Sequence, residues 1–82
     1  MSEPAIREAI LAQTAACAAG RSITPEDVAK ALAPEAWHAL LSRVRREAIR
    51  LAQEGQIEIL RKGKPVDPAA EIRGVIRLRA RA

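Results

Sequence analysis

The stretch from residue 35 to residue 55 holds the side chains best suited to bind a ligand, and it is the longest stretch with no Pro or Gly before its end. Arginine can donate two parallel hydrogen bonds to guanine, and it can neutralise phosphate charge elsewhere on a duplex. Residues with this chemistry recur at helical spacing: His38, Ser42, Arg43, Arg45, Arg46 and Arg50. The pattern predicts a basic helix face that contacts duplex DNA. The alternative is a solvated face with intrahelical pairs, such as Arg43 with Glu47 and Arg50 with Glu54.

The other side of the same stretch is apolar and must face a core. Its residues follow the i, i+3, i+4 spacing of an amphipathic helix: Trp37, Leu40, Leu41, Val44, Ala48, Leu51 and Ala52. We expect this helix to begin at Pro34 or Glu35 and to stop at Gly55, in a left-handed cap. Trp37 is the only aromatic residue of the chain. Its place in the stripe favours packing over a role as a base-stacking platform.

Beyond Gly55 the apolar period changes from 3.6 to 2, which indicates β-structure. Residues 56–61 and 74–79 alternate as strands do, and their inward residues are Ile57, Ile59, Ile76 and Leu78. Residues 62–65 predict a turn, and residues 66–73 predict an extended loop. Two antiparallel strands after a helical unit would form a wing.

The predicted wing carries a second basic group. It comprises Arg61, Lys62, Lys64, Arg77 and Arg79. These side chains could rest against a minor groove or a phosphate backbone. The alternative is that charge on short strands protects their edges from pairing with other chains.

The N-terminal segment predicts a helix from Pro4 to Ala19. Pro4 suits a first helical turn, Ser2 can cap it, and Gly20 is expected to end it. Cys17 lies on the apolar face near the C-terminal end, where a role as a small buried hydrophobic residue is favoured over a reactive thiol.

A helix-turn-helix pattern follows. Thr24 can cap a second helix, which is expected to run to Ala33 and is separated from the long amphipathic helix by a brief turn. Asp27, in the first turn, is expected to bond back to the cap or to pair with Arg21 or Arg45. We interpret Asp27 as a residue that stabilises the fold rather than as a functional group.

The composition bounds the fold class and the compartment. Eighty-two residues allow one domain with a small, aliphatic core. Residues 1–42 contain three basic and five acidic side chains, whereas residues 43–82 contain eleven basic and five acidic ones. Such a polarised basic half is typical of proteins that bind polyanions. The high charge, the single cysteine and the lack of any apolar run near ~20 residues favour a cytoplasmic protein with no membrane segment.

The sequence gives little indication of catalysis, a metal or a cofactor. The single histidine, His38, has no cysteine cluster near it, and the four glycines lie at predicted element boundaries rather than in a phosphate-binding loop. Glu26, Asp27 and Glu35 lie in first helical turns, where the helix dipole explains them. We therefore expect neither an enzyme nor a cofactor or metal site.

Four sequence patterns together resemble a known family. They are RSITPEDVA at residues 21–29, W-x-x-L-L-x-x-V-R-x-x-A at residues 37–48, KGKPVD at residues 62–67 and GVIRLR at residues 74–79. They resemble a family of small bacterial proteins of unknown function with a winged-helix-like fold, over nearly the whole chain from residue 6 to residue 79. The resemblance implies the fold, and it carries no activity that could be transferred to single residues.

These observations predict an α+β fold, mainly helical with a small antiparallel wing. We expect a single winged helix-turn-helix domain over residues 1–82, of order α-β-α-α-β-β, whose first strand is the segment 21–23 before Thr24-Pro25. The leading hypothesis is duplex DNA binding in a transcription-regulatory role, with the third helix in the major groove and the wing on the backbone. The alternative is a protein–protein interaction module, in which the first helix pairs with a protein partner or a second copy through Leu11, Ala15 and Ala18.

Overall fold

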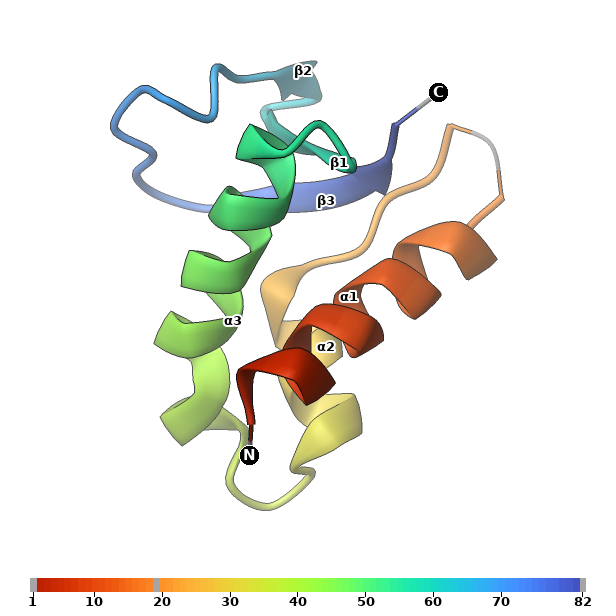
Figure 1. Ribbon diagram of the computed structural model, residues 1–82, viewed down its shortest axis with the longest axis vertical. Helices are drawn as coiled ribbons and strands as arrows, with labels where there is room; N and C mark the ends of the chain where they lie inside the picture. The colour runs from red at the N-terminus through yellow and green to blue at the C-terminus, as the bar shows by residue number, and fades with distance from the viewer. Residues whose placement is uncertain (1, 19, 82) are drawn as a thin grey trace.

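Three helices pack beneath a small antiparallel sheet (Figure 1). The computed structural model describes residues 2–18 and 20–81. The helices are α1 (Glu3–Ala16), α2 (Pro25–Leu32) and α3 (Trp37–Gln53), and the strands are β1 (Ile57–Arg61), β2 (Lys64–Pro65) and β3 (Arg77–Ala80). The strand order in the sheet is β2-β1-β3, and both pairings are antiparallel. The predicted α+β class is confirmed.

Two of the helices begin with the predicted caps. The Ser2 hydroxyl accepts a hydrogen bond from the Ala5 N–H, at 3.4 Å, at the start of α1. At α2, the Asp27 N–H donates to the Thr24 hydroxyl at 3.1 Å, and the Thr24 N–H donates to the Asp27 carboxylate at 2.9 Å. This reciprocal capping box satisfies two N–H groups that no helical carbonyl can reach. Asp27 therefore bonds back to the cap, one of the two roles predicted for it.

The predicted end of α1 is wrong. The helix was expected to run to Ala19, which lies outside the described residues, but it ends at Ala16, and Cys17 is already extended. The Thr14 hydroxyl donates to the carbonyls of Ile10 and Leu11, at 2.9 and 3.1 Å. A side chain that competes for helical carbonyls weakens the last turn.

The long helix starts later than predicted and ends as predicted. Residues 34–36 form a turn, and α3 begins at Trp37 without a side-chain cap, so the predicted start at Pro34 or Glu35 is wrong. At the other end Gly55 has φ +78°, and the N–H of Gln56 donates to the Leu51 carbonyl at 3.0 Å. This is a Schellman cap, in which a left-handed glycine lets the chain turn back over the last helical carbonyls.

The sheet differs from the prediction in three details. Residues 21–23 form no full strand, because only Ile23 pairs with β3, through hydrogen bonds of 2.8 and 2.7 Å to Leu78. Residues 62–65, predicted as a turn only, contain the additional strand β2 after a two-residue turn, in which Lys62 and Gly63 have φ of +52° and +80°. Two positive φ values are typical of the tight hairpin turn that suits the twist of paired strands. The last strand begins at Arg77 rather than at Gly74.

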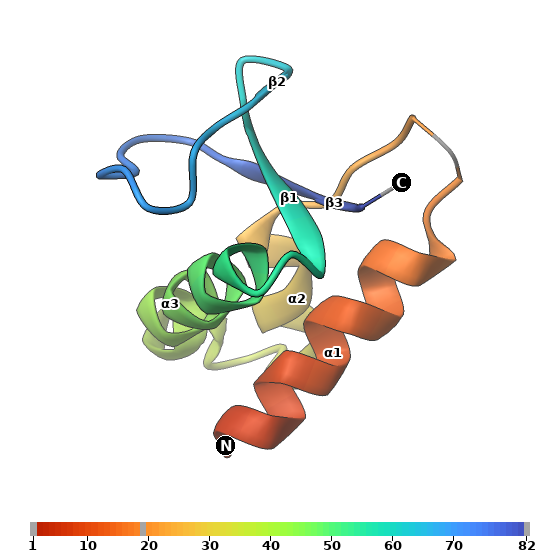
Figure 2. The ribbon, with the colours of Figure 1, turned by 45° about the horizontal axis from the view of Figure 1, so that its top comes forward.

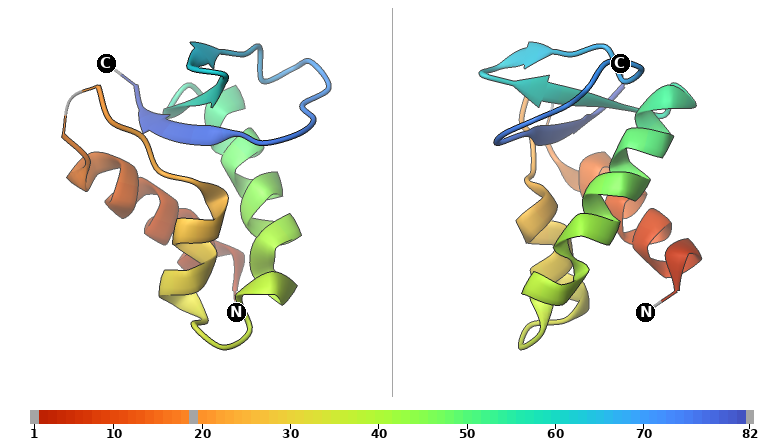
Figure 3. Two further views of the ribbon diagram at one scale, coloured as in Figure 1. Left: turned by 180° about the vertical axis from the view of Figure 1, so that it is seen from behind. Right: turned by 90° about the vertical axis from the view of Figure 1, so that its left-hand side faces the viewer.

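The core lies between the helices and the inner face of the sheet. It is aliphatic, as predicted, and its buried residues come from α1, α2, α3, both long strands and the loop before β3: Ile6, Ile10, Val28, Leu40, Val44, Leu51, Ile57, Ile59, Ile76 and Leu78 are among them. Trp37 is half-buried at its edge. The views from behind and from the side show α3 standing beneath the sheet, with one long flank free of other helices (Figure 3).

Candidate nucleic-acid interface

The outer face of α3 holds part of the predicted basic group in an exposed position. His38, Ser42 and Arg46 are exposed, and the Arg43 and Arg45 residues beside them are half-buried. The helix is continuous from Trp37 to Gln53, so residues four apart stack along its outer side. The structure therefore brings His38, Ser42 and Arg46 onto one line.

His38 and Trp37 form a ring stack at the start of α3. Their ring centroids are 3.5 Å apart with an interplanar angle of 28°, and the Lys30 Nζ lies 4.7 Å from the Trp37 ring centroid. Trp37 thus joins α2 to α3, as the packing interpretation predicted. One face of the His38 ring stacks on Trp37, but His38 as a whole is exposed.

The tight hairpin between β1 and β2 presents the wing lysines. Lys62 and Lys64 are exposed, and the hairpin turn is the part of the sheet that projects farthest from the helices (Figure 2). Among residues 2–18 and 20–81, no hydrogen bond or ion pair holds the side chains of Lys62, Lys64 or Arg46. These three cations keep their charge available for an external anion.

The segment between β2 and β3, residues 66–76, folds back along one flank of α3. Arg45 donates from Nη1 to the Gly74 carbonyl at 3.1 Å, and Gln53 donates from Nε2 to the Pro68 carbonyl at 3.1 Å. The half-buried residues Val66 and Ile72 pack against the core. Arg45 is therefore a brace for this loop as well as a member of the predicted basic face.

Arg61 lies over the same loop. A Cβ built on Gly74 would come within 2.5 Å of the Arg61 Nη1, so the guanidinium occupies the space that a side chain at this position would need. Gly74 has φ +79°, which also favours glycine. Arg45 and Arg61, which are 16 positions apart in sequence, thus meet at one loop residue.

The two arginines of β3 lie apart from the outer face of α3. Arg77 donates to the Ser22 hydroxyl at 2.6 Å and to the Ser22 carbonyl at 2.9 Å. Arg79 forms an ion pair with Glu58 of β1, at 2.8 Å. Both guanidiniums are engaged by neighbours within the sheet region, on strand positions rather than beside the helix.

Arg50 is held on the opposite flank of α3, where α3 faces α1. It pairs with Glu47 at 3.2 Å and with Glu3 of α1 at 3.7 Å. Glu47 is 4% exposed and also accepts a hydrogen bond from Arg7, at 3.5 Å. Charge counting missed this network, because Arg7 and Glu47 are 40 positions apart. Glu47 lies at helical spacing among the apolar residues of α3, and that position could have indicated its burial.

Arg7 also forms two hydrogen bonds with Glu54, one of them at 3.0 Å from Nη1 to Oε2. These bonds hold the pKa of the Glu54 carboxyl below its usual value of 4.5, against the opposing effect of partial desolvation. The same bonds raise the pKa of the Arg7 guanidinium. We call the group formed by Glu3, Arg7, Glu47, Arg50 and Glu54 the α1–α3 seam.

The comparison with protein families agrees with the family resemblance of the four sequence patterns. A family model described as "Protein of unknown function (DUF3253)" matches residues 3–81, which is nearly the whole chain. The chain belongs to the DUF3253 family. No curated protein matches this DUF3253 chain.

This DUF3253 structure bears on a metal site and on a membrane-spanning helix only through its described residues. Among the described residues, no group of three or more His, Cys, Asp or Glu side chains is placed to hold a metal ion. Within the same residues, none of the helices has both the length and the apolar character needed to cross a bilayer.

Proposed function

We propose that this DUF3253 chain binds duplex DNA without catalysis, in a transcription-regulatory role. The observation that supports this proposal is the distribution of partners among the cations. The seam arginines are paired with carboxylates, whereas Arg46, Lys62 and Lys64 have no such partner among the described residues. Cations left without carboxylates can bind phosphate without first breaking an ion pair.

The fold suits such a role. A short helix, a turn and a longer helix with an exposed outer side are the parts of a helix-turn-helix, and the three-stranded sheet after them is compatible with a winged helix. In this proposal His38, Ser42 and Arg46 face the base edges of the major groove. Lys62 and Lys64 on the hairpin contact the phosphate backbone.

The other residues predicted to bind DNA contribute to the proposed interface less directly. Arg43 and Arg50 flank the outer face of α3 and can reach phosphates, although Arg50 must then share its charge with Glu47. Arg45 and Arg61 fix the loop at Gly74 beside the helix. Arg77 and Arg79 are assigned only a long-range electrostatic contribution, because both are bonded within the protein.

The proposal is tested by fluorescence anisotropy with a labelled random-sequence duplex of about 20 base pairs, titrated at low and at physiological salt. We expect micromolar binding that weakens steeply with salt. Lys62→Ala/Lys64→Ala should weaken it at least about tenfold at low salt, and Arg46→Ala should do so by a smaller factor.

The matched control is Arg21→Ala/Arg81→Ala, which removes two exposed cations that line one depression at the other end of the sheet and do not belong to the proposed interface. It changes the net charge by the same amount and should change the affinity much less. Absence of binding to any duplex at low salt would overturn the proposal. Equal losses in both double variants would show attraction by net charge without a defined interface.

One observation favours a second candidate function, association with another protein. Val75 is 83% exposed and is the large hydrophobic residue that the described surface leaves uncovered. Analytical ultracentrifugation of the chain tests self-association directly. A dimer that Val75→Asp converts to monomer, in a protein that binds no DNA at low salt, would favour this candidate over the first.

A further inference from the structure

Val75 lines one side of a shallow depression beside the N-terminal half of α3. The depression has a volume of about 140 Å³ and is lined by residues of α2, α3 and the loop before β3: Thr24, Pro25, Glu26, Leu41, Arg45, Gly74, Val75 and Ile76. Pockets for whole small molecules are usually at least about 300 Å³. The depression is too small for a cofactor, but it can receive a single methyl group.

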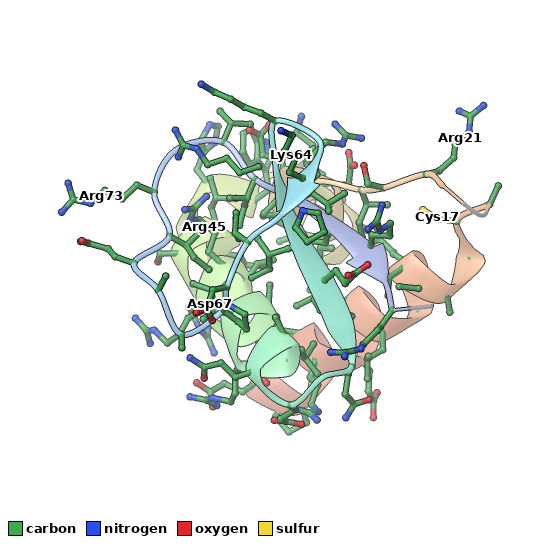
Figure 4. The ribbon with its side chains drawn as sticks, turned by 90° about the horizontal axis from the view of Figure 1, so that it is seen from above. Cys17, Arg21, Arg45, Lys64, Asp67 and Arg73 are labelled. Atoms are coloured by element: carbon green, nitrogen blue, oxygen red, sulfur yellow. The ribbon has the colours of Figure 1, made fainter. Side chains whose placement is uncertain are left out.

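The backbone on both sides of Val75 is fixed. Arg45 donates to the Gly74 carbonyl at 3.1 Å, and the Arg61 guanidinium covers the Cα side of Gly74. On the other side, Ile76 is 2% exposed and belongs to the core. Val75 is therefore an apolar side chain held outward between two anchored neighbours, rather than a residue on a free loop end. Figure 4 shows Arg45 on the side of the molecule where this loop runs, across from Cys17 and Arg21.

The surroundings of Val75 combine apolar and cationic groups. Leu41 is half-buried next to it, and Arg45 is half-buried beside the same depression. Glu26 is the carboxylate at the rim, and Lys30 faces it at 3.9 Å. Lys30 offsets the charge of Glu26 and Arg45 adds a cation, so a small apolar group next to an anion is a suitable occupant. The major groove of duplex DNA offers such a group at the 5-methyl group of thymine, which is surrounded by phosphates.

We propose that Val75, supported by Leu41, contacts thymine methyl groups and gives the interface a preference for thymine. The inference rests on the DNA-binding function proposed above, and it names a base and a residue that reads it. His38 of the outer face precedes Leu41 by three positions, which is about one helical turn, and in this proposal it occupies the same groove. Val75 acts as a specificity residue, and the lysines of the hairpin supply most of the affinity.

The experiment compares two labelled 20-base-pair duplexes of alternating adenine and thymine, identical except that one contains deoxyuridine in place of thymidine. The two differ only in the 5-methyl groups. We expect the wild-type chain to bind the thymine duplex more tightly by about fourfold for each methyl that it buries. Val75→Ser should bring the ratio of the two affinities close to one.

Val75→Ile is the matched variant, because it keeps an apolar side chain at the same exposed position and should keep the preference. Equal affinity of the wild-type chain for the two duplexes would overturn the inference, and so would a preference that Val75→Ser leaves intact. Both results leave the proposed function standing, since the duplexes are still bound. Failure to bind either duplex at low salt would overturn the proposed function itself, and this inference with it.

Discussion

The two flanks of α3 use arginine in different ways. On the flank that faces α1, Arg7 of α1 pairs with Glu47 and Glu54, and Arg50 pairs with Glu47, which is almost completely buried. On the flank that faces the wing, Arg45 donates to a loop carbonyl.

The outer face between these flanks holds Arg46, with no partner among the described residues. A basic composition therefore does not indicate which cations are available to a ligand. The positions of the carboxylates decide which cations are available, because breaking the ion pair of a buried carboxylate leaves its charge uncompensated and is costly.

The largest effect is expected where the two flanks share a core. Leu51 is fully buried beneath α1 and the sheet. Leu51→Ala should lower the free energy of unfolding by about 3 kcal/mol, through lost burial and the cavity that remains. Urea denaturation measures it. A loss below about 1 kcal/mol would mean that the site refills, and that the core here is less closely packed than the structure shows.

A smaller effect is expected from the seam. Arg7→Met should lower the urea midpoint, though by less than Leu51→Ala, because it removes a partner of the buried Glu47 and both bonds to Glu54. Arg46→Met, on the outer face, should leave the midpoint nearly unchanged. Similar losses in these two variants would contradict the contrast between the flanks.

The seam should also give the stability a dependence on pH. Because Arg7 holds the folded pKa of Glu54 below 4.5, the contribution of this bond is complete above that pH. It is lost as the pH falls through the lower, folded pKa. The difference in urea midpoint between wild type and Arg7→Met should therefore be constant near neutral pH and shrink on acidification below 4.5. A difference that persists into strong acid would assign the loss to packing of the Arg7 side chain instead.

The wing should be recognisable by its effect on salt dependence rather than on stability. Lys62→Ala/Lys64→Ala should reduce the slope of log affinity for DNA against log salt by about 1.8, as expected for two lost phosphate contacts. The control Arg21→Ala/Arg81→Ala should keep the slope of the wild type. Anisotropy titrations at four or more salt concentrations provide these slopes, and an unchanged slope in the wing variant would place the contacts elsewhere.

The smallest effect is expected at Lys62, where one substitution should change stability and DNA affinity in opposite directions. Lys62 adopts φ +52° next to Gly63, a conformation that asparagine tolerates better than lysine. Lys62→Asn should therefore stabilise the chain by about 0.5 kcal/mol while weakening DNA binding. Thermal unfolding and anisotropy are measured on the same sample. Gly63→Ala is the opposite control, which should destabilise the hairpin by about 1 kcal/mol.

The local elements followed from the sequence wherever short-range rules act. The capping box at Thr24 and Asp27 and the left-handed cap at Gly55 depend on residues at most five positions apart. The apolar spacing of α3 and the alternation of β1 assigned the core side of each. The end of α1 and the strand β2 were missed. The end of α1 depends on the bonds of the Thr14 hydroxyl to helical carbonyls, and β2 depends on pairing with β1.

The sequence by itself determined an aliphatic α+β fold and a basic C-terminal half, because periodicity, caps and composition are properties of neighbouring residues. Only the tertiary structure decided which cations face a carboxylate. Arg7 meets Glu54 across 47 positions, and Arg45 meets Gly74 across 29. Such partners depend on how α1 and the wing loop pack against α3, which no local pattern encodes. The physical reason is that Coulomb energy follows distance in space, and chain folding sets that distance independently of separation in sequence.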